Sequence, residues 1–218
     1  AHDFNNILTS ILGNIKLARI SADTAPNIAE ILTEAEEACR RAKELTNQLL
    51  TFSKGGKPIR KITSIAESIK NSALFSIRGS NVKCELSIPR DLWLVEIDEG
   101  QINQVVYNLV LNAIQAMPHG GTINISAENI QVDTKSALPI PDGDYIKIAV
   151  TDHGIGIPPE YLPKIFDPYF TTKQKGSGLG LASTYSIIKN HDGHIDVRSE
   201  TGAGTTFFIY LAAIKDKM

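Results

Sequence analysis

The sequence QINQVVYNLVLNAIQAM at residues 101–117 has the pattern of an amphipathic helix, because its apolar side chains recur at steps of three and four residues. Asn108 and Asn112 are one turn apart and share a face among valine, leucine and isoleucine neighbours. Asparagine is a poor helix former, and burying its amide without hydrogen bonds is costly. The pair is interpreted either as two hydrogen-bonded amides of the core or as oxygen ligands for Mg²⁺, a hard cation that prefers oxygen.

Two glycine clusters follow this helix in the sequence. Asp152-His-Gly-Ile-Gly156 comes after a predicted strand, and Gly176-Ser-Gly-Leu-Gly180 opens a predicted helix. Glycine lets backbone amides approach a phosphate, and helix N-termini attract anions. Neither cluster is a Walker loop, since the only Gly-Lys pair, Gly56-Lys57, is followed by proline, and neither fits the dinucleotide fingerprint. Each cluster alone is equally consistent with a plain turn.

The segments around these motifs predict an α+β fold beyond residue 58. Two further amphipathic helices are expected, near residues 65–74 and 179–190. Short strands in hairpins, rather than a regular alternation of strand and helix, favour an α/β sandwich of the α+β class. The strands are expected near residues 82–88, 93–97, 122–128, 145–151, 194–199 and 205–211.

Residues 1–57 predict an antiparallel helical hairpin. Apolar residues from Phe4 onward recur with helical spacing until a proline-containing break at residues 21–27. A second helix then carries a heptad repeat and ends at Gly55-Gly-Lys-Pro58, because glycine caps helices and proline cannot continue one. We place the domain boundary there, with the second domain at residues 58–218. Two helices cannot enclose a core, so we expect a homodimer in which two hairpins form a four-helix bundle.

The composition is that of a folded, nearly neutral chain. Its 218 residues are 42% hydrophobic, with 22 Lys and Arg against 24 Asp and Glu, a net charge of −2. This balance argues against a nucleic-acid partner. No apolar run approaches the roughly 20 residues of a membrane span, so we expect a cytoplasmic chain without membrane contact of its own. The chain starts at Ala1 with a helix already under way at Phe4, and we expect a fragment of a longer protein whose full length allows a membrane anchor.

The motifs occur in an order that resembles a known family. The ordered segments are Asn108-Leu-Val-Leu-Asn112-Ala, Asp152-His-Gly-Ile-Gly156, Phe166-Asp-Pro-Tyr-Phe170, Gly176-Ser-Gly-Leu-Gly180-Leu and Gly202-Ala-Gly-Thr-Thr206. They resemble the N, G1, F, G2 and G3 boxes of histidine kinases, and His2-Asp-Phe-Asn-Asn6 resembles the phosphoacceptor box of their nitrogen-regulatory-type branch. The resemblance covers nearly the whole chain. It implies a hairpin for dimerisation and phosphotransfer, followed by an ATP-binding domain of the Bergerat fold.

For the adenine end of an ATP site, the resemblance implies four residues. The carboxylate of Asp152 is expected to accept a hydrogen bond from the adenine amino group. Gly154 and Gly156 are expected to shape the floor of the pocket, and Thr206 to support the same end of the site.

For the phosphate end, the resemblance implies that Asn112 ligates Mg²⁺, with Asn108 completing the polar face as the second candidate metal ligand. Lys173 is close enough in sequence to add positive charge beside the phosphates. The segment 166–178 is expected to be a mobile lid, hinged by its glycines. The loop residues expected to bind the nucleotide are Gly176, Gly178, Leu179 and Gly180.

His2 is the expected site of phosphorylation. A neutral imidazole is nucleophilic near pH 7, and Asp3 fits a general base that accepts the ring proton. Asn6 lies one turn further on, where its amide is expected to position a water against the acyl phosphate of a partner protein. The other histidines are interpreted as structural: His119, His153, His191 and His194.

The expected activity is an ATP-dependent protein histidine kinase that phosphorylates His2 and then an aspartate of a response regulator receiver domain, with phosphatase activity on that regulator. One alternative is an ATPase of the gyrase or chaperone type. Those enzymes carry a glutamate in place of Asn108, and asparagine cannot activate water as a base. The other alternative is a catalytically silent scaffold, which the intact glycine boxes, Asn112 and His2 argue against.

Overall fold

The computed structural model describes residues 58–133, 136, 138–173 and 176–214, together with residues 9, 11–13, 15–16, 18, 32–33, 35–36 and 39. The chain divides into two compact units, Ala1–Gly55 and Gly56–Met218. In the first unit the described residues are helical, and Lys16 pairs with the buried Glu36, with 3.6 Å between Nζ and Oε1. His2, Asp3 and Asn6 lie outside the described residues.

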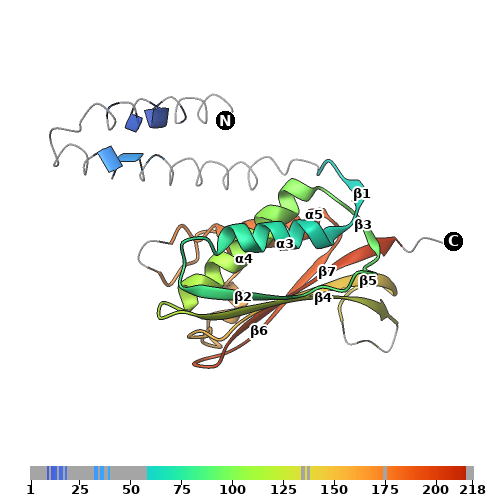
Figure 1. The fold of residues 1–218 in the computed structure, drawn as a ribbon. Coiled ribbons are helices and arrows are strands. Elements are labelled where there is room, and N and C mark those ends of the chain that lie inside the picture. The colour runs from blue at the N-terminus through green and yellow to red at the C-terminus, as the bar shows by residue number, and fades with distance from the viewer. Residues whose placement is uncertain are drawn as a thin grey trace. The chain divides into compact units, whose positions relative to one another are not determined.

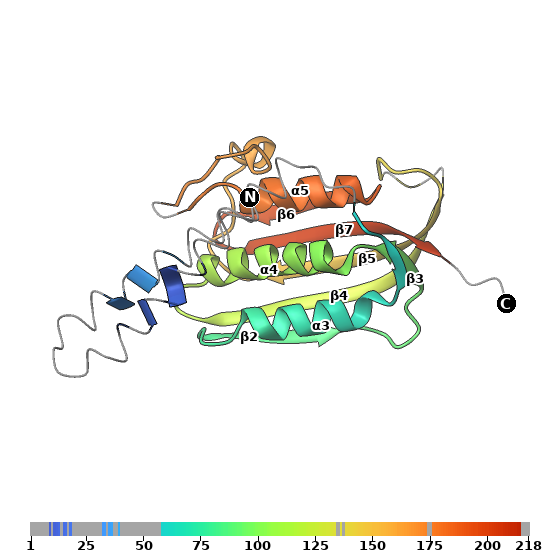
Figure 2. The same ribbon diagram turned by 90° about the horizontal axis from the view of Figure 1, so that it is seen from above.

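The second unit has two layers, with helices covering one face of a sheet (Figure 1). The helices are α3 (Ile65–Ser76), α4 (Glu99–Ala116) and α5 (Gly180–Asn190). They lie side by side with α4 in the middle (Figure 2). The strands are β1 (Lys61–Thr63), β2 (Val82–Ser87), β3 (Leu94–Ile97), β4 (Gly121–Val132), β5 (Gly143–Asp152), β6 (His194–Glu200) and β7 (Gly204–Ile214). A short 3₁₀ helix, η1, spans Leu162–Lys164.

The sheet follows the order β1-β3-β7-β5-β4-β2, and β6 also pairs with β7. Among the described strands, β2 and β4 pair in parallel and the other pairs are antiparallel. The register between β5 and β7 sets Asp152 opposite Thr205 and Thr151 opposite Thr206. Opposed residues in antiparallel strands share a face of the sheet, so these two pairs lie on opposite faces.

The core lies between the helices and the sheet. Because α4 is covered by helices on both sides and by the sheet beneath, most of the apolar residues along it are buried. Each fully buried valine, leucine or isoleucine contributes about 1.5–3 kcal/mol to folding. The buried residues of α4 are Ile102, Val105, Val106, Leu109, Val110 and Ala113, and those of β4 and β5 that meet them are Ile123, Ile125, Ile146, Ile148 and Val150.

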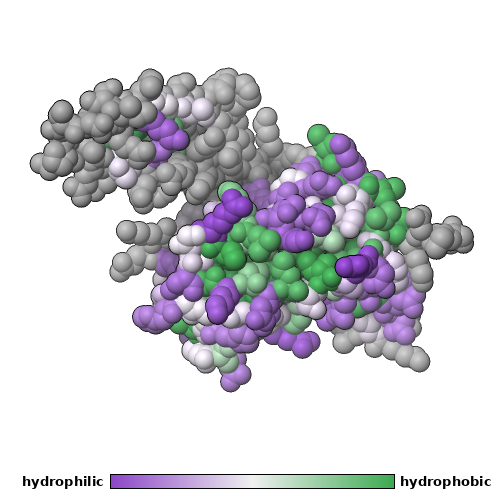
Figure 3. Space-filling view, viewed as in Figure 1, coloured by the Kyte–Doolittle hydropathy of each residue, from purple (hydrophilic) through white to green (hydrophobic). Residues whose placement is uncertain are grey.

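The fold class expected from the sequence is confirmed, and the expected helices and strands lie within a few residues of those observed. The pattern did not indicate β1 or η1, which are three residues each, too short for a period to be read. One side of the unit keeps apolar side chains on its surface over α3 and β2 (Figure 3). There, Leu74 and Phe75 of α3 are 41% and 64% exposed.

Asp98 fixes the N-terminus of α4 to the start of the second unit. One carboxylate oxygen accepts the backbone N–H of Gln101 at 3.2 Å, as the N-cap of the helix, and the other accepts the N–H of Ile59 at 3.0 Å. One residue further, Glu99 accepts a hydrogen bond from the hydroxyl of Thr63 at 2.8 Å. The segment that enters the second unit is thereby attached to the first turn of α4.

The buried His191 joins the N-terminus of α4 to the C-terminus of α5. Nε2 of His191 accepts the backbone N–H of Asp98 at 3.0 Å, and Nδ1 lies 2.8 Å from the carbonyl oxygen of Ile187, to which it donates. The ring is therefore neutral, with its proton on Nδ1. Burial lowers the pKa of His191, and Arg60 adds to the lowering, whereas the Ile187 carbonyl and the carboxylates of Asp98 and Asp192 oppose it. The sequence-based interpretation of His191 as structural agrees with these contacts.

We predict that acid destabilises the second unit through His191. Since the pKa of His191 in the folded chain lies below its ordinary value of 6.5, the unfolded chain takes up this proton first. The free energy of unfolding should therefore be highest above about pH 6.5 and fall as the pH is lowered below it. Urea unfolding at about pH 7.5 and about pH 5.5 measures this slope.

The variant His191→Gln should be about 1–3 kcal/mol less stable near neutral pH, because it disturbs the two hydrogen bonds of a buried ring. It should also show a shallower pH dependence than the wild type. His119→Gln, in an exposed turn, is the matched control and should keep the wild-type slope. Equal slopes for the wild type and His191→Gln would rule out this role.

Candidate nucleotide-binding site

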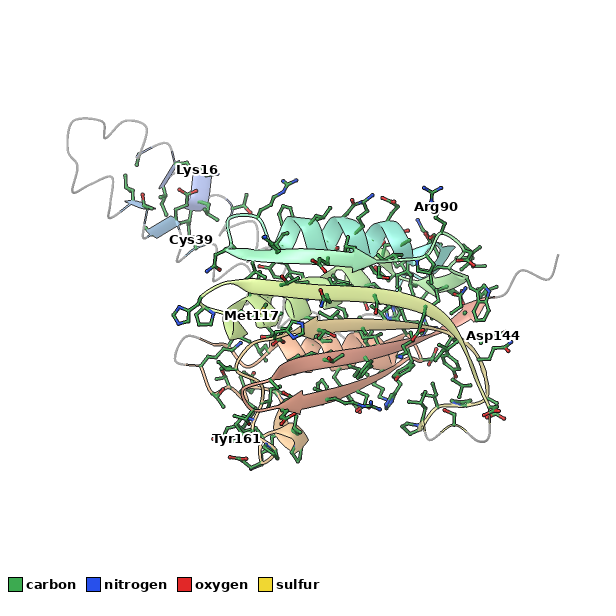
Figure 4. The ribbon with its side chains drawn as sticks, turned by 60° about the horizontal axis from the view of Figure 1, so that its bottom comes forward. Lys16, Cys39, Arg90, Met117, Asp144 and Tyr161 are labelled. Atoms are coloured by element: carbon green, nitrogen blue, oxygen red, sulfur yellow. The ribbon has the colours of Figure 1, made fainter. Side chains whose placement is uncertain are left out.

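The predicted site residues of the second unit come from one end of the two layers. Met117, directly after α4, and Tyr161, beside η1, lie toward this end of the sheet, whereas Arg90 and Asp144 lie toward the other (Figure 4). Asp152 ends β5 at the same end, and Gly180 begins α5. The C-terminal half of α4 contributes Asn108 and Asn112.

The carboxylate of Asp152 is buried, with 6% of the residue exposed. Its Oδ1 accepts the backbone N–H of Gly154 at 2.9 Å. Burial raises the pKa of Asp152, while the backbone amides of Gly154 and Thr205 and the positive charges of His153 and Lys173 act in the opposite direction. A buried carboxylate with acceptor capacity to spare favours a ligand that brings a hydrogen-bond donor.

The structure places the hydroxyl of Thr206, expected near the adenine end, away from the carboxylate of Asp152. Its hydroxyl lies 3.0 Å from that of Thr151, on the face of the sheet opposite to Asp152. The residue that shares the face of Asp152 is Thr205, which is buried and 5% exposed. Its hydroxyl lies 2.9 Å from that of Ser199. The sequence cannot show which of two adjacent threonines faces Asp152. The strand register decides it, because a shift of one residue moves a side chain to the other face of the sheet.

The loop after Asp152 is held by close backbone contacts. The N–H of Ile155 donates to the carbonyl of Ala116, the last residue of α4, at 3.1 Å. A Cβ at Gly154 would lie 2.4 Å from the same carbonyl oxygen. Gly156 has a φ of +68°, and a Cβ there would lie 2.0 Å from the carbonyl oxygen of Glu200. These glycines are therefore required by the packing of the loop against its neighbours.

Asn108 connects α4 to the first turn of α5. The residue is 4% exposed, and its Nδ2 donates to the carbonyl of Gly180 at 3.0 Å and more weakly to the hydroxyl of Thr184 at 3.4 Å. Both amide hydrogens are used in these contacts, which fits the interpretation as a hydrogen-bonded core amide. Leu179, the N-cap of α5, buries its side chain in the core at 1% exposure and presents only its backbone to the site.

Asn112 is half-buried and faces a cation. Its Oδ1 accepts a hydrogen bond from Nζ of Lys173 at 3.2 Å, and Oε1 of Gln115 lies 2.5 Å from the same nitrogen. Lys173 is exposed as a residue, yet desolvation of its ammonium group lowers its pKa, and the charge of Asp152 opposes this lowering. An ammonium group held by two amide oxygens shows that this donor set accepts a positive charge, and oxygen ligands are those that Mg²⁺ prefers. The residues present therefore fit the magnesium site expected from the sequence.

The segment after η1 is anchored by aromatic residues. The ring of Phe166 lies 5.3 Å from that of Tyr185 and 6.5 Å from that of Phe207, and Phe170 lies 5.7 Å from Tyr161. Both phenylalanines pack against the core, as the sequence-based interpretation expected. The expected lid, residues 166–178, falls partly outside the described residues.

Gly176 and Gly178 lie where the glycine-rich loop returns toward α5. Gly178 has a φ of +68°, its carbonyl accepts the N–H of Tyr169 at 3.0 Å, and a Cβ there would lie 2.4 Å from the carbonyl carbon of Tyr169. The N–H of Gly176 donates to the carbonyl of Lys173 at 3.2 Å.

The sequence did not indicate three further residues of this region, Thr205, Ser199 and Gln115. Gln115 lies three residues after Asn112 and so on the same helix face.

Comparison with protein families shows which class of protein has this fold and site. Residues 97–214 match the family of histidine kinase-, DNA gyrase B-, and HSP90-like ATPases. Residues 1–58 match the His Kinase A (phospho-acceptor) domain. The first match covers 118 of the 218 residues, counted from 97 to 214, so the chain belongs to this ATPase family. With the phosphoacceptor match beside it, the chain is the catalytic core of a histidine kinase.

Individual relatives agree with this class. The chain is 40% identical to the sensor kinase CckA of Brucella abortus (strain 2308), over 97% of this chain and 23% of that protein. It is 33% identical to the sensor histidine kinase ZraS of Escherichia coli (strain K12), over 97% of this chain and 43% of that protein. The chain therefore spans less than half the length of these curated relatives.

Solved structures show the same fold. The catalytic domain of the histidine kinase ThkA is 30% identical, with a TM-score of 0.58 over 71% of this chain and 95% of that chain. Full-length ShkA, crystallised in complex with AMPPNP, has a TM-score of 0.77 over 100% of this chain and 46% of that chain. At 22% identity, the likeness to ShkA supports the fold alone.

We predict that Thr205, and not Thr206, supports nucleotide binding. Thr205→Val removes the hydroxyl on the face of Asp152 and should weaken ADP binding by about fivefold to tenfold, the effect of one lost hydrogen bond of about 1 kcal/mol. Thr206→Val is the matched control, since its hydroxyl lies on the other face, and it should bind ADP like the wild type. Calorimetric titration with ADP measures both. A larger loss in Thr206→Val than in Thr205→Val would contradict the assignment.

Proposed function

We propose that this chain autophosphorylates His2 from Mg-ATP and passes the phosphoryl group to an aspartate of a response regulator receiver domain. The observation that carries the proposal is the joint presence of a site with a buried carboxylate and a cation-binding amide, Asp152 and Asn112, and a phosphoacceptor domain match at residues 1–58. Within that domain, His2-Asp-Phe-Asn-Asn6 is the segment that we assign to the nitrogen-regulatory-type branch.

At the adenine end, Asp152 would accept a hydrogen bond from the exocyclic amino group of adenine. Its burial makes such a bond favourable, because the carboxylate has few competing water molecules. Gly154 and Gly156 would form the floor, since side chains there would collide with the backbone of Ala116 and Glu200. Thr205 would complete this end from β7.

At the phosphate end, Asn112 would hold the magnesium ion, which neutralises phosphate charge as the phosphoryl group is transferred. Asn108 would contribute through its amide oxygen, because its amide hydrogens are occupied by α5. Lys173 would add positive charge beside the phosphates. Gly176, Gly178 and Gly180 would let backbone amides at the start of α5 approach them.

In the hairpin, the neutral imidazole of His2 would attack the γ-phosphorus of ATP, and ADP would leave. The bond from phosphorus to the bridging oxygen breaks as the bond to the ring nitrogen forms, and Asp3 would accept the proton from the other ring nitrogen. Asn6 would position a water against the phosphorylated aspartate of the regulator, which gives the regulator phosphatase activity. We further propose that the hairpin pairs with a second copy as a four-helix bundle.

ATP hydrolysis as the main activity is disfavoured by Asn108. An amide cannot take a proton from water, and in this structure its hydrogens bind the backbone and a side chain of α5. Water attack on ATP would therefore lack a base at this position.

The proposal places the chain in the cytoplasm, where ATP and response regulators occur. In the part of the chain that the structure describes, no helix is both long and apolar enough to cross a membrane.

We predict that the chain acquires label from ATP radiolabelled at the γ-phosphate. The label should be lost in acid and survive base, as expected for a phosphorus–nitrogen bond. His2→Gln should abolish it, whereas His119→Gln, a histidine in an exposed turn, should label like the wild type. Normal labelling of His2→Gln would refute the assignment. Release of inorganic phosphate without any labelled protein would favour the ATPase alternative.

We predict that Asn6→Ala separates the two activities of the hairpin. It should label from ATP at the wild-type rate, because Asn6 does not take part in the attack on the γ-phosphate. It should dephosphorylate a phosphorylated regulator at a rate lower by about a hundredfold, since general assistance to an attacking water contributes on the order of 10²-fold or more. Loss of both activities to the same extent would show that Asn6 supports only the fold.

A further inference from the structure

Lys173 places a positive charge between two amide oxygens of α4. Its Nζ lies 3.2 Å from Oδ1 of Asn112 and 2.5 Å from Oε1 of Gln115. The two oxygens come from residues three apart in the C-terminal half of the helix, so they project from one face. Amide oxygens are acceptors, and their convergence on one ammonium group makes a cation site with two protein oxygens, Asn112 and Gln115.

The backbone around Lys173 is held by local contacts. Its N–H donates to the hydroxyl of Thr171 at 3.1 Å, and its carbonyl accepts the N–H of Gly176 at 3.2 Å. A Cβ at Gly176 would lie 2.4 Å from the Thr171 hydroxyl oxygen, so a side chain there would displace that hydroxyl. The ammonium group reaches the oxygen of Asn112 across 61 residues of sequence.

We propose that Gln115 is a further protein oxygen of the magnesium site beside Asn112, and that Lys173 occupies this site in the nucleotide-free chain and leaves it when Mg²⁺ binds. The inference rests on the proposed function, since it takes Asn112 as the metal ligand. Beyond that function, Gln115 joins the metal site, and Mg²⁺ replaces the ammonium group of Lys173 there.

Physical reasons favour the exchange over joint occupation. The ammonium group and Mg²⁺ both require oxygen acceptors, and two positive charges held by the same pair of oxygens would repel each other. The displaced Lys173 then has no acceptor at Asn112 or Gln115. Its long, flexible side chain and its charge are suited to the phosphates that arrive with the metal. Binding of the metal and binding of the lysine to phosphate are thus coupled in one step.

The test measures how much Mg²⁺ enhances the binding of ADP to the whole 218-residue chain. The dissociation constant of a fluorescent ADP analogue is determined in saturating Mg²⁺ and in EDTA, and the ratio of the two is the enhancement. ADP excludes turnover, so the readout does not depend on kinase activity. Both substituted residues are exposed, so neither substitution is expected to disturb folding, and thermal melting verifies this.

Gln115→Met removes the oxygen at similar size and should lower the enhancement by about tenfold to a hundredfold, the effect of losing one hydrogen bond to a charged group. Lys173→Met should bind Mg²⁺ more tightly than the wild type when no nucleotide is present, because Mg²⁺ no longer displaces an ammonium group and no phosphate contact is involved. The double variant should depart from the sum of the two effects, since both act on the same pair of oxygens. Lys164→Met, an exposed lysine of η1, is the matched control and should keep the wild-type ratio.

The outcomes are distinguishable. If the wild type binds ADP no better with Mg²⁺ than without it, the proposed function is overturned. If the wild type shows enhancement but Gln115→Met leaves it unchanged, Gln115 is not part of the metal site. If Lys173→Met weakens ADP binding equally in Mg²⁺ and in EDTA, Lys173 binds only phosphate and does not compete with the metal.

Discussion

The amide of Asn108 holds the middle helix of the second unit against the first turn of α5. Asn108 is buried, and its contact with the Thr184 hydroxyl is buried and that with the Gly180 carbonyl is part-buried. Losing a buried hydrogen-bond partner costs about 1–3 kcal/mol, because the group left behind stays unsatisfied. The contact also has a geometric effect. It keeps Asn112, one turn further along α4, at a constant distance from the glycine-rich segment that begins α5, so the two parts of the phosphate end are positioned by one side chain.

Asn108 and Asn112 lie one turn apart on the same face of α4, yet their surroundings differ. The sequence left open whether they are core amides or metal ligands; the structure shows a hydrogen-bonded core amide at Asn108, and the metal-ligand role of Asn112 stays a proposal. Asn108 is enclosed and hydrogen-bonded between helices, whereas Asn112 is half-buried and faces a charged amine. The difference arises from the neighbours of α4, with α5 beside one residue and Lys173 beside the other. Neither neighbour can be read from the helix pattern.

Periodicity predicted the long helices and strands, because each repeats its pattern over several residues. The ordered glycine and asparagine motifs also predicted which residues gather at one end of the sheet. The choice between Thr205 and Thr206 could not be predicted, since both are threonine and a shift of one residue reverses the face. The contact of Lys173 with Gln115 joins positions 58 residues apart and depends on the loop as folded. His2, Asp3 and Asn6 remain predictions.

The attachment at Asp98 has a mechanical consequence. One aspartate binds the backbone of Ile59, where the chain enters the second unit, and starts α4. Asn112 lies 14 residues after Asp98 (112 − 98), about 21 Å along the helix axis at 1.5 Å per residue. A packed α-helix is stiff over such a length. The entry segment at Ile59 and the proposed metal ligand Asn112 are therefore both attached to α4. Because the helix between them is continuous, a displacement of its N-terminus moves Asn112 as well.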